Sequence, residues 1–392
     1  MLSPPILILI IAVCGILIFA PHLLYYNYIR KNLRRSAYAT KRLKNAVKLS
    51  VLICTLNAAK NIHNKVEQVL RQNYPRSSLE LIVVDGGSTD GTVETLRSIR
   101  DKLSSEIDFT LVENRPFVGK ASQINEGFKV AKGEFVITTD VDVKIDETAI
   151  GTLVDSLAED NVGAVCARQV LTNPHQSTAT RTEAKYRGYY ELLRIGESNL
   201  CSTPIFHGGL SAYRRSAVSP IDEDVNADDT QLALSAIHNG YRAVYESNCV
   251  FYNESPKGFR NAWSQRVRRA QGLERVFWRN RDMLFNRKYG SFGSIVFPAE
   301  CFMHLISPLL FAGEIALLVL LLFSSAPFSP MMSAVGVMTI AVLAVFLYFV
   351  RSLSAAELLI TYVLYQLALV WAMVLHAFGR NYARWSWLGK AG

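Results

Sequence analysis

The run LSVLICT at residues 49–55 begins the alternating pattern that decides the fold of this 392-residue chain. It is followed by NIHNKVEQVLRQ (61–72), whose apolar residues share one helical face, and then by a second strand-like run, ELIVVDG (80–86). Short β-branched runs and amphipathic stretches alternate as far as about Lys257. This alternation is typical of a largely parallel sheet with crossover helices.

The same alternation continues through the middle of the chain. The pattern predicts strand, helix, strand, helix and strand at DFTLVEN (108–114), KASQINEGFKVAK (120–132), EFVITTD (134–140), DETAIGTLVDSLAED (146–160) and VGAVCAR (162–168). We therefore expect an α/β domain of the Rossmann-like, nucleotide-binding type over residues 49–256. In such sheets, functional groups gather beyond the carboxyl ends of the strands.

The N-terminal end of the chain is hydrophobic. Residues 4–28 carry no charge and are long enough to cross a hydrocarbon core, which takes roughly 20 apolar residues. A cleaved signal peptide is the alternative, but its positive charge would precede the apolar run. Here the basic residues follow the run, in a juxtamembrane linker at 29–48. By the positive-inside rule, this order predicts that the α/β domain lies in the cytoplasm.

The C-terminal end, residues 297–379, holds three more candidate spans. They are Phe297 to Phe323, Met331 to Val350 and Glu357 to Phe378. Glu300 and His304 predict that the first of them is kinked or partly interfacial, unless these groups face protein. Four spans would place the basic tail at 380–392 outside, against the positive-inside rule, so the sequence leaves the number of spans open.

The formal net charge of +9 raises the question of nucleic acid, but the basic residues cluster beside the apolar segments. Anionic lipid headgroups and substrate phosphates account for them more simply, so no nucleic-acid partner is expected. The six cysteines show no Cys-x-x-Cys spacing. They predict reduced thiols rather than a disulfide framework or a zinc site.

Carboxylates follow two of the predicted strands. Asp85 opens the loop DGGSTDGT, whose glycines let backbone approach a ligand, although its Ser, Thr and Asp side chains could simply cap the next helix. Asp140 and Asp142 follow EFVITT, and on an extended chain their carboxylates would point to the same side. Oxygen ligands at this spacing suit Mg²⁺ or Mn²⁺ bridging the protein to a diphosphate.

A second acidic pair, Asp228 and Asp229, opens a predicted helix. The helix dipole alone favours a carboxylate there, so an N-cap is one interpretation. The functional interpretation is a general base that takes a proton from an acceptor hydroxyl. Asp229 is the expected base and Asp228 is the fallback.

A basic segment runs from Lys257 to Lys288. It could lie as an amphipathic helix on anionic lipid, and residues 257–296 are expected to include such interfacial helices. Gln265 and Arg268 would share one helical face, so both side chains could reach one pyrophosphate. Lys120 is a further candidate contact for a diphosphate or a sugar, with a solvated lysine as the alternative.

In this order, the motifs resemble those of the inverting family 2 glycosyltransferases with a GT-A fold, specifically the membrane-integrated branch. The resemblance covers roughly residues 49–272 and rests on ICTLNAAKNI, VVDGGSTDGT, GKASQINEG, TTDVDV, HGGLSAYRRSAV, DDTQLALSAIHNGYRAVYE and QRVRRAQG. It implies a UDP- or GDP-linked sugar donor and transfer with inversion.

The resemblance also implies roles for individual residues. By this resemblance, Asp85 would contact the nucleobase of the donor, Asp140 would contact the donor, and Asp142, with Asp140, would bind the metal. Asp229 would be the general base. Gln265 and Arg268 would match the Gln-x-x-Arg-Trp element. The remaining expected donor contacts are Thr55, Asn57, Lys120 and Arg269.

Three departures from the family pattern stand out. Cys54 lies where the family often has proline, and Ala58 lies where it often has glutamate. Arg269 replaces the tryptophan of Gln-x-x-Arg-Trp. In polysaccharide synthases that aromatic lies near the acceptor, so its absence weakens a cellulose-like or hyaluronan-like processive interpretation.

We therefore expect an enzyme that moves one sugar from a nucleotide sugar to a lipid acceptor at the cytoplasmic face of a membrane. A polyprenyl phosphate, a lipid-linked saccharide and a ceramide-like lipid all remain open as acceptors. A processive polysaccharide synthase is the first alternative, although such enzymes tend to carry more spans. A catalytically silent nucleotide-sugar-binding scaffold is more remote, because the motif residues are retained together. A transporter is more remote still, because a cytoplasmic α/β domain would have no role in it.

Overall fold

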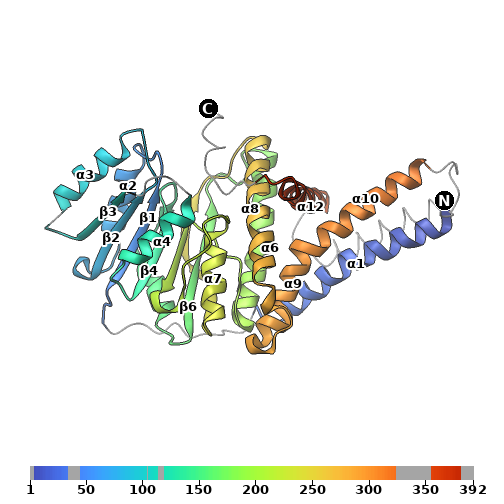
Figure 1. The fold of residues 1–392 in the computed structure, drawn as a ribbon, viewed down its shortest axis with the longest axis horizontal. Helices are drawn as coiled ribbons and strands as arrows, with labels where there is room; N and C mark the ends of the chain where they lie inside the picture. The colour runs from blue at the N-terminus through green and yellow to red at the C-terminus, as the bar shows by residue number, and fades with distance from the viewer. Residues whose placement is uncertain (1–3, 34–44, 104, 114–118, 324–354, 381–392) are drawn as a thin grey trace.

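The computed structural model describes residues 4–33, 45–103, 105–113, 119–323 and 355–380. An α/β domain lies beside a group of long apolar helices, and α6 and α8 stand between the two (Figure 1). The predicted span Met331 to Val350 lies outside the described residues.

One eight-stranded sheet forms the centre of the α/β domain, in the order β3-β2-β1-β4-β7-β6-β8-β5. The strands are β1 (Leu49–Thr55), β2 (Leu79–Asp85), β3 (Asp108–Glu113), β4 (Phe135–Asp140), β5 (Lys144–Ile145), β6 (Val162–Leu171), β7 (Leu210–Arg214) and β8 (Arg242–Asn253). Strands β1 to β4 pair in parallel, as does β6 with β8. Strand β7 runs antiparallel to β4 and β6, and β5 runs antiparallel to β8. The predicted mostly parallel sheet is confirmed.

Helices cover both faces of the sheet. On one face lie α2 (Ile62–Leu70), α3 (Thr92–Leu103) and α5 (Ala149–Leu157); on the other lie α4 (Lys120–Val130), α6 (Thr178–Leu200) and α7 (Asp228–His238). Alternation along β1 explains the two layers, because Val51 and Ile53 join the core under α2 whereas Leu52 faces α4. Short 3₁₀ turns lie at Arg76–Ser78, Arg215–Ala217, Arg281–Met283 and Arg287–Tyr289.

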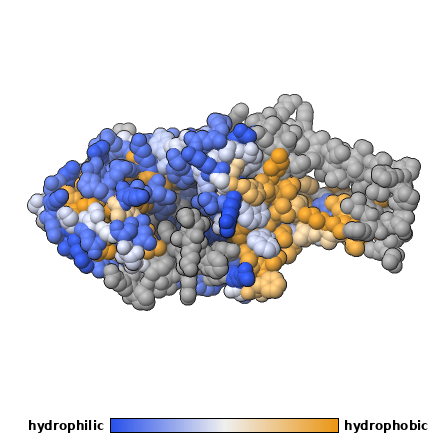
Figure 2. All heavy atoms as spheres, turned by 90° about the horizontal axis from the view of Figure 1, so that it is seen from above, coloured by the Kyte–Doolittle hydropathy of each residue, from blue (hydrophilic) through white to orange (hydrophobic). Residues whose placement is uncertain are grey.

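The remaining helices form the apolar part of the molecule. They are α1 (Pro4–Arg30), α8 (Phe259–Arg279), α9 (Phe297–Cys301), α10 (Ser307–Phe323) and α12 (Ala355–Ala377). Among the described residues, three stretches are long and apolar enough to cross a membrane: Ile6–Arg30, Phe292–Leu320 and Ile360–Ala377. Hydrophobic residues gather over this part, whereas the α/β domain presents mainly hydrophilic ones (Figure 2).

The second apolar stretch begins at Phe292, before the predicted Phe297, and contains π-helical turns at Phe292–Val296 and Phe302–Ile306. Such wide turns are a recognised cause of helix bending. Glu300 and His304 are both buried in protein, which satisfies the condition for ionisable groups within a span.

Helix α1 is fastened to α6 at its C-terminal end. The hydroxyl of Tyr25 donates to Glu197 at 2.5 Å. A Cβ on Gly196 would lie 2.3 Å from the Cγ2 of Ile29, so the glycine lets the two helices approach closely. This contact fixes the apolar helices to the α/β domain.

Candidate active site

Three of the predicted residues lie at the carboxyl edge of the parallel strands. Thr55, at the end of β1, pairs with Asp85 at the end of β2, and Cys54 pairs with Asp140 at the end of β4. The predicted placement of Asp85 and Asp140 on one edge is confirmed. The prediction of an extended chain through Asp142 is wrong, because β4 ends at Asp140 and residues 141–142 form a turn.

A cavity of about 290 Å³ lies beyond this edge. It is bounded by strand ends, by the start of α7 and by α6 and α8. The structure brings seven of the predicted residues to its lining: Asp140, Asp142, Asp228, Asp229, Gln265, Arg268 and Arg269. These seven residues come from three separate parts of the sequence and meet at one site.

The aspartates of this cavity, Asp140, Asp142, Asp228 and Asp229, form what we call the acidic wall. Lys120 joins it, since its Nζ lies 2.7 Å from Asp140 Oδ1 and 3.3 Å from Asp228 Oδ2. Burial alone would lower the pKa of Lys120, but these two carboxylates hold it well above its usual range. Lys120 is thus a charged member of the site and not a solvated surface lysine.

The backbone of Gly208 lies where several of these groups converge. A Cβ at this position would be 3.2 Å from Lys120 Nζ, 3.7 Å from Asp229 Oδ2 and 3.9 Å from Asp140 Oδ2. Only a glycine leaves this space open without displacing a functional group.

Asp229 has the properties of a base at neutral pH. Burial raises its pKa to about 7, with help from the charge of Asp228 and against that of Lys120. Its Oδ1 accepts a bond from the Thr230 N–H at 2.9 Å. Neither acidic residue caps α7 through its side chain as an N-cap would; that position belongs to Ala227, which has a left-handed φ of 67°.

Helix α8 presents two different faces to the cavity. Gln265 and Arg268 line it together, and the charges of Asp228 and Asp140 act on Arg268, against burial that lowers its pKa. Arg269 is the next residue along the helix, yet it turns to Glu183 of α6 at 3.1 Å. Neighbouring residues on a helix point about 100° apart, so the two arginines serve different parts of the site.

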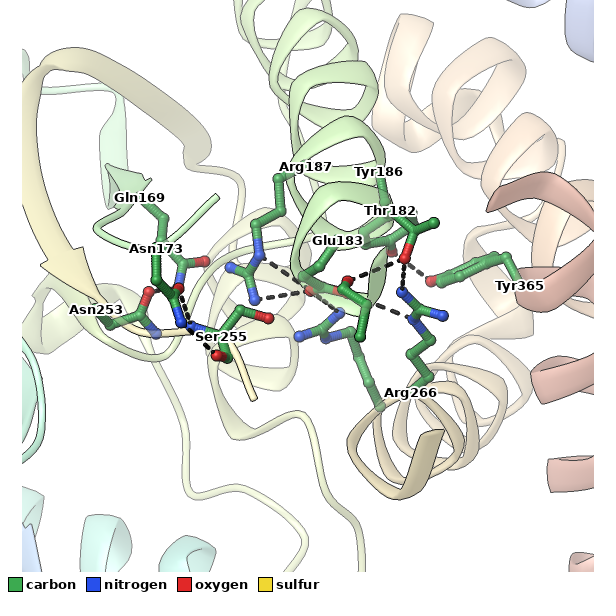
Figure 3. A network of polar contacts seen from close by, with 12 residues as sticks. Gln169, Asn173, Thr182, Glu183, Tyr186, Arg187, Asn253, Ser255, Arg266 and Tyr365 are labelled. Atoms are coloured by element: carbon green, nitrogen blue, oxygen red, sulfur yellow. Dashed lines mark hydrogen bonds and ion pairs between the residues drawn. The ribbon is translucent and has the colours of Figure 1, made fainter. Parts of the chain in front are cut away.

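Three arginines form a second part of the lining, which we call the basic wall: Arg187 and Arg194 from α6 and Arg269 from α8. Glu183 lies behind them and binds Arg187 at 2.8 Å (Figure 3). Arg266 binds the same carboxylate at 3.5 Å and donates to Thr182 at 2.8 Å. Burial would raise the pKa of Glu183, but the surrounding arginines outweigh it and lower the pKa to about 2.

His207 lies where the two walls meet, beside Gly208. Burial lowers its pKa well below the usual range, and the charges of Arg194, Arg187 and Arg269 lower it further. The imidazole is therefore neutral and adds no charge to the basic wall.

Asp85, Thr55 and Asn57 are not part of the cavity lining. The carboxylate of Asp85 is fully buried and accepts the N–H groups of Gly87 and Ser88 at 2.8 and 2.9 Å and the hydroxyl of Thr55 at 3.1 Å. Asn57 accepts the N–H of Thr89 at 2.9 Å. These bonds fasten the loop after β1 to the loop after β2.

Sequence reasoning missed the α6 contribution altogether. Glu183, Arg187 and Arg194 repeat at helical spacing within an otherwise aromatic and apolar face, and this spacing was the available signal. His207 and Gly208 lie in the quoted HGGLSAYRRSAV motif but carry no charge at neutral pH that would single them out.

Asp140 and Asp142 both line the cavity, and they are the residues that would hold a divalent cation. Limited hydration within the cavity raises the pKa of Asp142, and the neighbouring charge of Asp140 adds to the shift. A bound cation would relieve this repulsion. No group of three or more His, Cys, Asp or Glu side chains is placed around one ion in the part of the chain that the structure describes. Donor phosphates and water would therefore complete the shell.

The chain is similar to known glycosyltransferases. The family model described as glycosyl transferase family 2 matches residues 50–221. A solved mannosyltransferase from Pyrobaculum calidifontis, in complex with GDP-Man and Mn²⁺, superposes with a TM-score of 0.79 at 28% identity. That comparison covers 96% of this chain and 100% of the mannosyltransferase.

Two curated relatives are synthases. Poly-beta-1,6-N-acetyl-D-glucosamine synthase of Staphylococcus epidermidis is 25% identical over 264 residues, which are 65% of this chain and 63% of the relative. The synthase of the same name from Staphylococcus aureus is 25% identical over 236 residues, 59% of this chain and 56% of that protein. The chain thus spans less than two thirds of the length of these relatives.

The fold and the site define a glycosyltransferase with a GT-A catalytic domain. Within that class, residues 50–221 are similar to glycosyl transferase family 2, and the Gln265–Arg269 element and the apolar helices follow them in the chain.

Proposed function

We propose that this glycosyltransferase moves one sugar from a nucleotide sugar to a lipid or lipid-linked acceptor at the cytoplasmic face of a membrane, with inversion at the anomeric carbon. The cavity is the observation that carries the proposal. Its acidic wall, Gln265 and Arg268 share one space, and α8 packs against the apolar helix α12. A donor site built this close to apolar helices suits an acceptor held in a bilayer.

The donor would lie along the carboxyl edge of the sheet. From Asp85 on β2 to Asp140 on β4 is two strand spacings, or about 10 Å. We assign the nucleotide end to the fastened loops around Asp85, Thr55 and Asn57, and the diphosphate to Gln265, Arg268 and Lys120. The GDP-Man in the solved mannosyltransferase supports a nucleotide sugar as donor.

Asp142, with Asp140, would hold Mg²⁺ or Mn²⁺, as the Mn²⁺ of that same structure supports. A bound cation supplies positive charge to the diphosphate as it leaves. The repulsion between the two carboxylates is the feature of this structure that fits such an ion. Arg268 would contribute charge to the same leaving group.

Asp229 would act as the general base for a hydroxyl acceptor. The acceptor oxygen forms a bond to the anomeric carbon while its proton passes to the Asp229 carboxylate. The bond from the sugar to the diphosphate breaks, and its electron pair leaves on the diphosphate oxygen. A lipid phosphate is already ionised, so an acceptor of that kind would attack without help from Asp229.

The basic residues Arg30 and Lys31, at the end of α1, support a cytoplasmic catalytic domain. Positive charge directly after an apolar helix favours the cytoplasmic side of a membrane. A cytoplasmic domain would also have direct access to nucleotide sugars.

A processive polysaccharide synthase is the second candidate, because the curated relatives are named poly-beta-1,6-N-acetyl-D-glucosamine synthases. Arg269, in place of the tryptophan of Gln-x-x-Arg-Trp, argues for the single transfer. Its side chain pairs with Glu183 and presents no flat apolar surface to a growing glycan.

The test uses the purified full chain with a panel of UDP- and GDP-linked sugars and either Mg²⁺ or Mn²⁺. We expect slow hydrolysis of one donor class, its loss on removal of the cation, and a fall of about 100-fold in Asp142→Asn. Added membrane lipid should receive a single sugar. A ladder of polymers from one donor would favour the synthase, and no turnover of any donor would contradict the proposed function.

A further inference from the structure

The basic wall is not used by the donor chemistry proposed above. The charges acting on Arg268 are those of Asp228 and Asp140, whereas those acting on Arg269 come from Glu183 of α6. Arg187 and Arg194 likewise belong to α6 and not to the Gln265–Arg268 face. One cavity thus holds two separate groups of arginines.

The basic wall gathers several guanidinium groups around one carboxylate. Glu183 is shared by three guanidinium groups, those of Arg187, Arg266 and Arg269. The neutral His207 offsets none of this charge. Clustered arginines that remain charged at a water-accessible cavity are suited to binding an anion with several oxygens, such as a phosphate.

Arg194 gives an independent indication of a ligand. Its side chain is only 2% exposed, and its Nε donates to the carbonyl of Ile205 at 2.6 Å. Its Nη1 is buried without a hydrogen-bond partner among the described residues. A buried unpaired donor on a charged group is costly, and a ligand oxygen in the cavity would satisfy it.

The basic wall is continuous with the apolar part of the molecule. Arg269 lies over the ring of Tyr186 at 5.8 Å, and the Tyr186 hydroxyl contacts that of Tyr365 on α12. Tyr186 lines the cavity and also a smaller pocket of about 70 Å³ between α1, α6 and α12. The polar surface of that second pocket is small, and its lining is mainly aromatic. A ligand with an anionic head and an apolar tail would fit here, with its head at the basic wall and its tail in the aromatic pocket.

We propose that the basic wall is a phosphate subsite for the acceptor: Arg187, Arg194 and Arg269 bind the phosphate of a lipid whose hydrocarbon chain leaves past Tyr186 toward the apolar helices. The inference rests on the proposed function and narrows its acceptor to a lipid that carries a phosphate. The attacking oxygen belongs either to that phosphate or, in a lipid-linked saccharide, to a sugar hydroxyl. The same phosphate chemistry occurs in the donor diphosphate, so the experiment has to separate the two sources.

The experiment measures two things on the full chain in detergent. The first is the affinity for phytanyl phosphate and for phytanol, which share one hydrocarbon chain and differ in the phosphate. The second is the KM for donor in acceptor-free hydrolysis. Arg187→Gln and Arg269→Gln are compared with Arg181→Gln, an exposed arginine on the same helix as Arg187. Arg187→Lys keeps the charge but not the planar pair of donors, and it serves if Arg187→Gln does not fold.

We expect the wild-type chain to bind phytanyl phosphate at least about 10-fold more tightly than phytanol. Arg187→Gln and Arg269→Gln should each lose most of that preference, Arg187→Lys should lose part of it, and Arg181→Gln should retain it. The donor KM should stay within about twofold in all of these variants.

Three results would overturn the subsite. If the wild-type chain bound phytanyl phosphate and phytanol with equal affinity, the phosphate would not be recognised. A raised donor KM with an intact lipid preference would assign the arginines to the donor diphosphate. If Arg181→Gln lost the preference for phytanyl phosphate to the same extent, the preference would depend on general surface charge and not on the basic wall. Failure of the proposed function is a separate result, since it shows as no hydrolysis of any nucleotide sugar.

Discussion

Two carboxyl groups, that of Asp229 in the acidic wall and that of Glu183 behind the basic wall, have pKa values shifted in opposite directions. The pKa of Asp229 is raised to about 7 by burial and by its neighbour Asp228, whereas that of Glu183 is lowered to about 2 by three arginines that outweigh burial. Burial acts in the same direction on both, so the charged neighbours decide the difference. The contrast is what we would expect if the acidic wall accepts a proton and the basic wall holds an anion.

The two walls also differ in origin. The acidic wall comes from strand ends and the start of α7, where an α/β sheet gathers its functional groups. The basic wall comes from α6 and α8, the helices that pack against α12. In the proposed function, the donor reacts at the sheet edge and the acceptor phosphate binds on the side that meets the apolar helices.

The largest expected effect comes from a substitution in the acidic wall. Asp229→Asn should lower transfer to a hydroxyl acceptor by about 1000-fold, because an amide cannot take the proton. The donor KM in hydrolysis should stay within about twofold. Asp160→Asn, the same change on an exposed residue, is the control. Near-normal transfer in Asp229→Asn would mean that the base lies elsewhere or that the acceptor is an ionised phosphate.

Removing the carboxylate behind the basic wall should mainly lower the stability of the protein. Glu183→Gln removes the shared partner of Arg187, Arg266 and Arg269 and should lower the free energy of unfolding by about 3 kcal/mol. Because its folded pKa is lowered from 4.5 to about 2, the wild-type contribution is present above pH 4.5 and is lost as the pH falls toward 2.

Thermal unfolding of the two proteins at neutral and acid pH measures this contribution. The exposed pair of Glu126 and Lys129 supplies the control, since Glu126→Gln should cost less than about 1 kcal/mol. Equal stability of Glu183→Gln and wild type at neutral pH would show that the arginine cluster does not depend on this carboxylate.

A substitution of Arg268 tests whether Arg268 and its neighbour Arg269 have different roles. Arg268→Gln should raise the donor KM by about 10- to 100-fold, since it removes a charged donor from the diphosphate. Arg279→Gln, on the same helix but paired with the exposed Asp222 and Asp224, is the control. If Arg268→Gln changed lipid preference and left the donor KM unaltered, the division of α8 into two faces would be wrong.

The pH profile tests the state of Asp229 directly. The active form is the carboxylate, so kcat/KM for a hydroxyl acceptor should rise with pH and level off above about 7. Below that value it should fall by about tenfold per pH unit. A flat profile between pH 5 and 8 would contradict a base with this raised pKa.

The smallest effect concerns the seam between α8 and the loop before α7. A Cβ on Gly272 would lie 3.0 Å from the backbone of Asn226, which lines the cavity. Gly272→Ala should displace that loop slightly and lower transfer by about threefold. Gly188→Ala on α6 adds a Cβ that meets nothing within 4 Å and should leave transfer unchanged. Equal transfer rates in Gly272→Ala and Gly188→Ala would show that the contact between α8 and this loop does not position Asp229.

Sequence reasoning went furthest where the signal is local. The strand β1 was predicted over its observed length, and α4 and β4 were predicted within two residues of theirs, because apolar periodicity over a short window is set by burial on a sheet or a helix. It failed at Asp142, which lies in the turn after β4, since the end of a strand depends on its pairing with its neighbours, here β1 and β7. Sequence reasoning also did not find the ion pair of Arg269 with Glu183, because the two residues are 86 positions apart in the chain.

The sequence by itself determined the α/β class, the apolar helices at both ends and the acidic residues that line the cavity. Each of these follows from composition, from local periodicity or from the rule that functional groups gather at the carboxyl ends of parallel strands. Only the tertiary structure decided that Asp85 is held by its own loop, that Arg268 and Arg269 separate, and that α6 supplies a basic wall. Those outcomes depend on contacts between residues far apart in the chain, and the packing of α6 and α8 creates them.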